Sequence, residues 1–169
     1  MAMTEEAVNE IINGLKEAGV NFVSLLPDSE FSSVQTRLLQ DPEVRCVSVS
    51  NEAIGVSVCA GAWLSGKVPA LLVPTSGLLV AAWPLTSICM SWGIPMVLII
   101  PFRGDMGDAH WVMRPYQYTT RGALDLLQIP YILVNRNAEI RQAIMAARRS
   151  AAGWLYPQAV LLTGEVIFS

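Results

Sequence analysis

The stretch Ser48-Val49-Ser50-Asn51-Glu52-Ala53-Ile54-Gly55-Val56 joins two different side-chain patterns. Residues 45–50 predict a strand, and the small residues of 52–65 predict a helix that begins directly after it. Asn51 suits the N-cap of that helix, and Glu52 in its first turn interacts favourably with the helix dipole. Glu52 therefore has two interpretations here: an ordinary helix-start residue, or a functional carboxylate at the end of a strand.

The alternation of short strand and helix continues on both sides of this junction. The first helix is expected between a cap at Thr4 and a stop at Gly19. Further strands are expected at residues 22–26, 70–73, 96–100, 131–134 and 159–162, and further helices at 31–39, 78–92, 118–127 and 137–152. Short apolar strands separated by helices are typical of a parallel sheet covered on both faces. We therefore expect one α/β domain over residues 1–169, with an open, mostly parallel sheet of about six strands and helices on both faces.

Two of the expected helices carry specific signals. Pro84 predicts a kink or a late start in the helix at 78–92. Asn137 and Gly153 are expected to cap the helix at 137–152.

The composition excludes several classes of protein. The chain of 169 residues is 53% hydrophobic and 15% charged, and residues 68–102 carry no charge. A membrane-spanning helix needs about 20 consecutive apolar residues, whereas Pro69, Pro74, Pro84 and Pro95 divide this segment into shorter pieces. We therefore expect no membrane span, and attribute the low charge to a buried sheet and a large subunit interface. A net charge of −3 without a basic patch gives no support for nucleic-acid binding.

The N-terminus and the cysteines predict a cytoplasmic protein. No basic segment followed by an apolar one precedes the first helix, so no secretory signal is expected. Cys46, Cys59 and Cys89 are far apart, lie in apolar elements and lack metal-ligand spacing. They are expected to be reduced core cysteines.

Polar residues gather where the expected strands end. Parallel α/β sheets place their sites at the carboxyl ends of the strands. Those ends hold Pro27-Asp28-Ser29, Asn51-Glu52, Thr75-Ser76-Gly77 and Arg103-Gly104-Asp105. No glycine-rich phosphate loop is present, and the only histidine, His110, has no serine elbow to form a catalytic triad. The polar edge nevertheless predicts a site.

Six short motifs resemble a known family. In chain order they are Leu26-Pro27-Asp28-Ser29, Ser50-Asn51-Glu52-Ala53, Thr75-Ser76-Gly77-Leu78, Pro95-Met96-Val97-Leu98-Ile99-Ile100, Arg103-Gly104-Asp105 and Ile129-Pro130-Tyr131. Together they are similar to the pyrimidine-binding (PYR) domain of thiamine-diphosphate decarboxylases. The branch they resemble most contains sulfopyruvate decarboxylase α subunits and phosphonopyruvate decarboxylase. The likeness covers about residues 20–135.

The resemblance implies a catalytic role for Glu52. The matching glutamate of the family hydrogen-bonds N1′ of the cofactor's aminopyrimidine, which allows the C2 ylid to form. The ylid attacks a 2-oxo acid, and the cofactor accepts the electrons as carbon dioxide leaves. A carboxylate with this role is expected to be buried against apolar neighbours.

The resemblance also implies roles for the other polar residues. Thr75, Ser76 and Gly77 match the loop that approaches the pyrimidine ring; alternatively they form a simple turn before a helix. Asp28 matches a proton-relaying aspartate that faces the substrate, with Ser29 beside it; alternatively Asp28 caps the next helix.

Arg103 and His110 have two interpretations each. Arg103 either steers the substrate's acid group or holds its own loop through Asp105 or Asp108. His110 is either a catalytic histidine of the loop or a surface residue.

Two departures from the family pattern lead to expectations about the substrate and about a partner subunit. Leu79 and Val80 stand where the family has a glycine and an asparagine, and Trp83 stands where a polar residue is expected. This more apolar and bulkier loop suggests a substrate more hydrophobic than a sulfonate or phosphonate. The Gly-Asp-Gly motif that holds Mg²⁺ and diphosphate is absent, since Met106 follows Arg103-Gly104-Asp105. This chain therefore supplies no metal ligand. A separate β subunit with the diphosphate-binding (PP) domain should complete the site, in an α2β2 or larger assembly.

Three alternatives to the decarboxylase remain at this point. The complex is a carboligase that joins the bound acyl unit to a second carbonyl, or this chain is a non-catalytic subunit with the same fold. In the third alternative the chain is a soluble α/β binding domain that binds neither the cofactor nor a partner chain.

Overall fold

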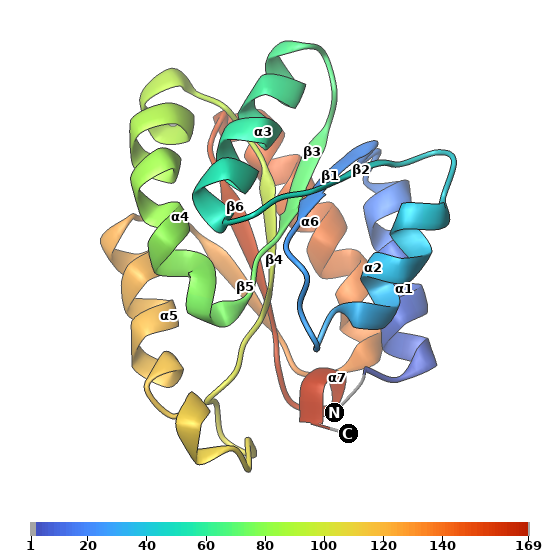
Figure 1. The fold of residues 1–169 in the computed structure, drawn as a ribbon, viewed down its shortest axis with the longest axis vertical. Coiled ribbons are helices and arrows are strands. Elements are labelled where there is room, and N and C mark those ends of the chain that lie inside the picture. The colour runs from blue at the N-terminus through green and yellow to red at the C-terminus, as the bar shows by residue number, and fades with distance from the viewer. Residues whose placement is uncertain (1–2, 169) are drawn as a thin grey trace.

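A six-stranded parallel sheet forms the centre of the molecule (Figure 1). The computed structural model describes residues 3–168. The strands lie in the order β2-β1-β3-β4-β6-β5, and every neighbouring pair is parallel. Their bounds are β1 (Phe22–Leu25), β2 (Arg45–Ser48), β3 (Pro69–Leu72), β4 (Val97–Pro101), β5 (Tyr131–Val134) and β6 (Gln158–Leu162). The expected fold class is thereby confirmed, with all strands rather than most of them parallel.

Helices cover both faces of the sheet, as right-handed crossovers require. The chain turns back after β2 and again after β5, so the connecting helices change face at those points. In Figure 1 helices α3, α4 and α5 lie on one side of the sheet, and α1, α2 and α6 on the other. Their bounds are α1 (Glu5–Glu17), α2 (Ser32–Gln40), α3 (Glu52–Leu64), α4 (Leu78–Pro84), α5 (Tyr116–Leu126) and α6 (Ile140–Trp154).

Alternate side chains of the central strands fill two hydrophobic cores. Leu72 and Ile99 point into the core beneath α1, α2 and α6, whereas Leu71 and Leu98 point into the core beneath α3, α4 and α5. A strand buried on both faces must be apolar throughout, which is why these segments read as continuous hydrophobic runs.

The three cysteines are free, and two of them are core residues. Cys59 and Cys89 are fully buried, and burial raises the pKa of each thiol to about 12. Cys46 is only half-buried, because it lies on the edge strand β2.

Two local features of the structure go beyond the expectations from sequence. The helix expected at 78–92 divides at Pro84, which ends α4 and is followed by the π-helical segment η2 (Leu85–Met90). A proline has no N–H to continue the helical ladder, and the wider turn accommodates its ring. The chain after β6 adds a short helix, α7 (Glu165–Phe168), that the sequence analysis did not anticipate.

The caps expected at Asn137 and Gly153 are wrong. Asn137 begins a short 3₁₀ segment, η4 (Asn137–Glu139), and Glu139 is the residue that precedes α6. At the other end Gly153 lies inside the helix, and Leu155 adopts the left-handed conformation with φ 52°. The N–H groups of Leu155 and Tyr156 both reach the carbonyl of Ala151, which ends the helix without a glycine.

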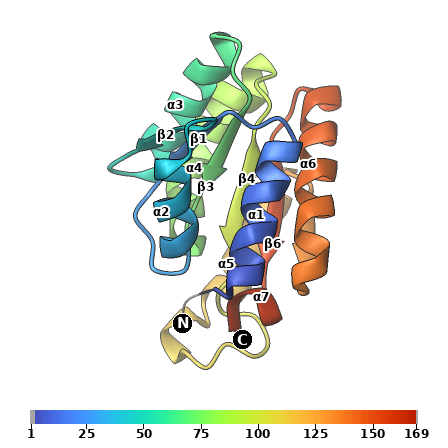
Figure 2. The same ribbon diagram turned by 90° about the vertical axis from the view of Figure 1, so that its right-hand side faces the viewer.

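The carboxyl ends of the strands meet at one end of the molecule. The loop between β4 and α5, drawn in yellow, lies there beside α7 and both chain termini in both views (Figures 1 and 2). The strand order reverses between β1 and β3, and open α/β sheets bind ligands at such a switch point. None of the helices within residues 3–168 is long and apolar enough to cross a membrane.

Candidate active site

Glu52 occupies the first turn of α3, where β2 leads into the helix. The side chain of Asn51 accepts a hydrogen bond from the N–H of Ile54 at 2.9 Å, so the expected N-cap is present. Gly55 lets α3 approach the sheet closely, because a Cβ there would come within 2.8 Å of Leu71. Glu52 is only 8% exposed. No group of residues 3–168 donates a hydrogen bond to its carboxylate, and its oxygens are not among the fully buried polar atoms that lack a partner. The carboxylate therefore keeps contact with solvent and is open to a ligand.

Gly77 lies against the side chain of Glu52. It ends the 3₁₀ turn η1 (Thr75–Gly77) that follows β3. A Cβ at this position would overlap the carboxyl group of Glu52, and its nearest atom would be Oε1. Gly77 has an ordinary φ of −90°, so glycine is required for space and not for backbone conformation. The structure thus brings Glu52 and the Thr75-Ser76-Gly77 turn together.

Thr75 ties this turn to the end of β4. Its buried hydroxyl donates to the carbonyl of Pro101 at 2.7 Å and accepts from the N–H of Arg103 at 3.3 Å. The hydroxyl thus both donates and accepts a hydrogen bond inside the protein, so the role these contacts indicate for Thr75 is to hold the turn in place. Ser76 between Thr75 and Gly77 is exposed.

Asp28 lies in the loop after β1, half-buried. Its Oδ1 accepts from the N–H groups of Glu30 at 2.9 Å and Phe31 at 3.1 Å. Asp28 therefore closes the turn before α2, whose own N-cap position is Phe31. Burial, together with the nearby charge of Glu30, raises the pKa of Asp28 to about 6. An aspartate that titrates near neutral pH suits proton transfer.

Arg103 is buried and bound by two carboxylates. Its guanidinium forms an ion pair with Glu30, and it donates to Asp108 at 2.8 Å from Nε and 3.1 Å from Nη2. Asp108 also accepts from the N–H groups of Gly104 and His110. Although burial opposes it, the bonds from Arg103 and these two N–H groups lower the pKa of Asp108 below its usual range. Of the two interpretations of Arg103, this geometry favours the one in which it holds its own loop.

Asp108 rather than Asp105 is the loop partner of Arg103. Asp105 instead accepts a hydrogen bond from Thr163, at the end of β6, at 3.1 Å.

His110 stands at the outer end of this network. Its Nδ1 lies 3.0 Å from Nη2 of Arg103 and 3.3 Å from Oδ1 of Asp108, and its side chain is 54% exposed. The imidazole is therefore attached to the loop on one side and accessible on the other. Ser29 is exposed, and its hydroxyl donates to Glu30.

Glu30 is the residue that sequence reasoning missed. It is 73 residues from Arg103 in the chain, and its side chain in the ion pair is 11% exposed. It stands beside the Leu26-Pro27-Asp28-Ser29 motif, but nothing in the sequence indicates which of the chain's basic residues it binds.

A solved structure of another protein shares this fold. The 2-oxoglutarate:ferredoxin oxidoreductase from Magnetococcus marinus superposes with a TM-score of 0.69 over 95% of this chain and 29% of that chain, at 13% identity. At that identity the likeness shows the fold.

Curated relatives define the family. Sulfopyruvate decarboxylase subunit alpha of Methanococcus maripaludis is 30% identical over 92% of this chain and 93% of that protein. Phosphonopyruvate decarboxylase of Streptomyces viridochromogenes is 32% identical over 90% of this chain, but only 40% of the longer protein is matched. A comparison with models of protein families finds no match. The chain belongs to the family of sulfopyruvate decarboxylase α subunits, and the resemblance to this branch is confirmed.

Proposed function

We propose that this chain is the α subunit of a two-chain, thiamine-diphosphate-dependent decarboxylase of 2-oxo acids. The names of its relatives support a decarboxylase subunit. One observation carries the more specific proposal: the side chain of Glu52 is largely buried, and its carboxylate has no partner within residues 3–168, at the carboxyl edge of a parallel sheet. A carboxylate held in a largely buried side chain, with its oxygens open and unpaired, is suited to bind a ligand.

The residues around Glu52 fit an aminopyrimidine. The carboxylate can bind a ring nitrogen and hold a proton there, and the missing side chain of Gly77 makes room for the carboxyl group in its present position. Thr75 fixes the turn that carries Gly77 by bonding to the end of β4. When bound, thiamine diphosphate supplies the electron sink for removal of carbon dioxide from a 2-oxo acid. Glu52 would activate the cofactor through the pyrimidine nitrogen.

Asp28 is the proposed proton relay. Its pKa of about 6 allows it to hold a proton near neutral pH and to release it. Oδ1 is occupied by two backbone N–H groups, and no described residue donates to Oδ2. Ser29 lies exposed in this loop and His110 lies exposed at the Arg103 network, and both are proposed to contact the substrate.

The Arg103 network positions the active-site edge. Glu30 follows β1, and Arg103 and Asp108 follow β4, so their ion pairs join the two loops on either side of β3. Because both carboxylates already bind the guanidinium, we propose a positioning role for Arg103 in place of direct binding to the substrate's acid group.

The diphosphate and Mg²⁺ are assigned to the partner β subunit. The Gly-Asp-Gly motif of the family is missing from this sequence. Residues 3–168 contain no group of three or more histidine, cysteine, aspartate and glutamate side chains able to hold a metal ion. Mg²⁺ needs six oxygen ligands, several of them from phosphates and water.

An apolar surface on α3 and α4 is the proposed contact with the β subunit. Trp83 is 77% exposed, and Leu79 and Val80 on the same helix are also exposed. A groove of about 320 Å³ beside Trp83 is lined by Ile54 and Asn51 of the Glu52 junction. Large apolar side chains that lie exposed next to one another are typical of protein interfaces. A β subunit bound here would cover the side of the chain next to Glu52.

Recovery of the native complex tests this proposal. The tagged chain is purified from its own cells under gentle conditions, and the complex is weighed by native mass spectrometry. We expect a second chain, thiamine diphosphate and Mg²⁺, with release of carbon dioxide from sulfopyruvate, phosphonopyruvate or an apolar 2-oxo acid. A complex that consumes 2-oxo acid only when an aldehyde is added would indicate the carboligase. A chain recovered alone and without cofactor would contradict the proposal.

A further inference from the structure

Within residues 3–168, the outer edge of β5 has no partner strand. β5 ends the sheet and pairs only with β6. The carbonyl of Pro130 accepts from the N–H of Ala159, and the carbonyl of Val134 accepts from the N–H of Thr163, so both point toward β6. Because successive peptide groups of a strand point in opposite directions, the N–H and C=O of Leu133 point away from β6. An edge without charged side chains or a covering element is a template for pairing with another strand, and β5 reads Tyr-Ile-Leu-Val.

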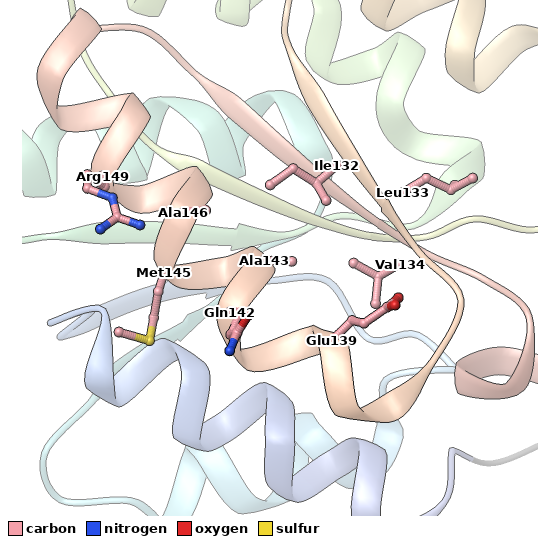
Figure 3. Close-up of a pocket in the computed structure, with 9 residues that line it drawn as sticks. All are labelled: Ile132, Leu133, Val134, Glu139, Gln142, Ala143, Met145, Ala146 and Arg149. Atoms are coloured by element: carbon pink, nitrogen blue, oxygen red, sulfur yellow. The ribbon is translucent and has the colours of Figure 1, made fainter.

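An apolar groove runs beside this edge. It has a volume of about 540 Å³ and lies between β5 and α6 (Figure 3). Ile132 and Val134 point from the strand toward α6, whose small residues Ala143 and Ala146 line the opposite wall. Ile132 is 37% exposed and Leu133 is 40% exposed, unlike the residues of the four inner strands. The groove is therefore a large unfilled apolar surface next to unpaired backbone.

The groove has opposite charges at its two ends. Glu139 lies at the end where α6 begins, and Arg149 lies near the end of the helix, as Figure 3 shows. Arg149 is exposed and forms no ion pair within the described residues, while Glu139 binds only its neighbour Arg136. A surface that is acidic at one end and basic at the other complements a copy of itself turned about a two-fold axis.

We propose that a second copy of this chain binds here through antiparallel pairing of β5 with β5. Leu133 of each copy exchanges both backbone hydrogen bonds with the other, which joins two six-stranded sheets into one. The two α6 helices then lie side by side over the joined strands, and Glu139 of each faces Arg149 of the other. This contact uses the β5 edge and α6, which lies on the other face of the sheet from α3 and α4. It therefore does not depend on the proposed function.

Charge reversal of the full chain tests the proposal. Sedimentation equilibrium is measured for the native chain, Arg149→Glu, Glu139→Arg and the double variant. We expect a dimer for the native chain, at least tenfold weaker association for each single variant, and recovery to within threefold in the double variant. Circular dichroism melting confirms that each variant is folded. Trp83→Ser is the matched control, and its association should equal that of the native chain.

Hydrogen exchange in the complex with the partner subunit provides a second measurement. The amide of Leu133 should exchange slowly in the native complex and at least tenfold faster in the Arg149→Glu complex. A fast Leu133 amide in the native complex would overturn the proposal, as would a double variant that associates no better than either single variant. Association lost in Trp83→Ser but kept in Arg149→Glu would also overturn it, because the copies would then meet through α4.

Discussion

Gly77 lies so close to Glu52 that no other residue fits without displacing the carboxylate. The two residues are 25 positions apart in sequence and follow different strands, β2 and β3, yet a Cβ on Gly77 would overlap the Glu52 carboxyl group. An ordinary helix-start glutamate points into water. This one is buried against the turn that the resemblance assigned to the cofactor.

Gly77→Ala should therefore lower catalysis much more than stability. The added methyl group forces the Glu52 side chain away from its present position, and we expect at least a tenfold loss in kcat/KM of the complex. Gly61→Ala is the matched control, because Gly61 lies in α3 and a Cβ there meets nothing within 4 Å. It should stabilise the chain by about 0.5–1 kcal/mol and leave turnover unchanged. Equal turnover in both variants would show that the close contact of Gly77 with Glu52 does not matter for catalysis.

Arg103→Met should strongly destabilise the chain. The change leaves Glu30 and Asp108 without their partner, with side chains only 11% and 2% exposed. Breaking a buried ion pair on one side costs about 3–5 kcal/mol. The exposed pair of Arg136 with Glu139 is the control, and Arg136→Met should change stability by less than about 1 kcal/mol. Urea unfolding measures both; similar losses would show that the Arg103 network contributes no more than a surface pair.

The titration of Asp28 predicts a pH dependence of stability. Its pKa is raised from 3.8 to about 6 in the folded chain, so the folded state binds the proton more tightly than the unfolded state. The contribution of Asp28 is therefore present below about pH 4 and is lost as the pH rises to about 6. The stability of Asp28→Asn relative to the native chain should rise across this range and then level off. A flat difference in urea unfolding would contradict the raised pKa.

Asp41→Asn is the control of opposite sign. Hydrogen bonds from the N–H of Glu43 and from Lys16 lower the pKa of Asp41. Its contribution is present above the unfolded pKa and is lost as the pH falls, so the two variants should show opposite slopes.

Trp83→Ser should weaken binding of the partner subunit. Exposed tryptophans that become buried in an interface often contribute 2 kcal/mol or more, so we expect at least a tenfold rise in Kd. Trp154→Ser provides the control, since Trp154 is 63% exposed at the end of α6 on the other face of the sheet. Titration of each variant with the partner measures both constants. Equal affinities for the two variants would move the interface away from α4.

The strands and the Asn51 cap could be predicted because they depend on local patterns. Apolar runs define the strands, and an Asn-Glu pair after a strand defines a helix start. The contact of Glu30 with Arg103 could not be predicted, because it depends on how β1 and β4 place their loops across β3. The end of α6 also depends on its surroundings: the chain passes Gly153 and turns at Leu155, which packs against Gly93.

The residues of the site were predicted from the sequence, but the hydrogen bonds between them were not. Sequence reasoning placed the polar residues at one edge and selected Glu52, which the structure shows to be buried. It did not reveal that the hydroxyl of Thr75 is used by Pro101 and Arg103. Hydrogen bonds between loops follow from three-dimensional geometry, which a single sequence does not encode in any local pattern.

Turnover of the Glu52→Gln complex tests the central claim most directly. Glutamine keeps the size of the side chain but cannot hold the proton at the pyrimidine nitrogen, so we expect at least a hundredfold loss of kcat with the partner still bound and the melting temperature nearly unchanged. Glu5→Gln, in the first turn of α1, is the matched helix-start control and should keep full activity. Full activity in Glu52→Gln would contradict the account, and Glu52 would then be a helix-start residue alone.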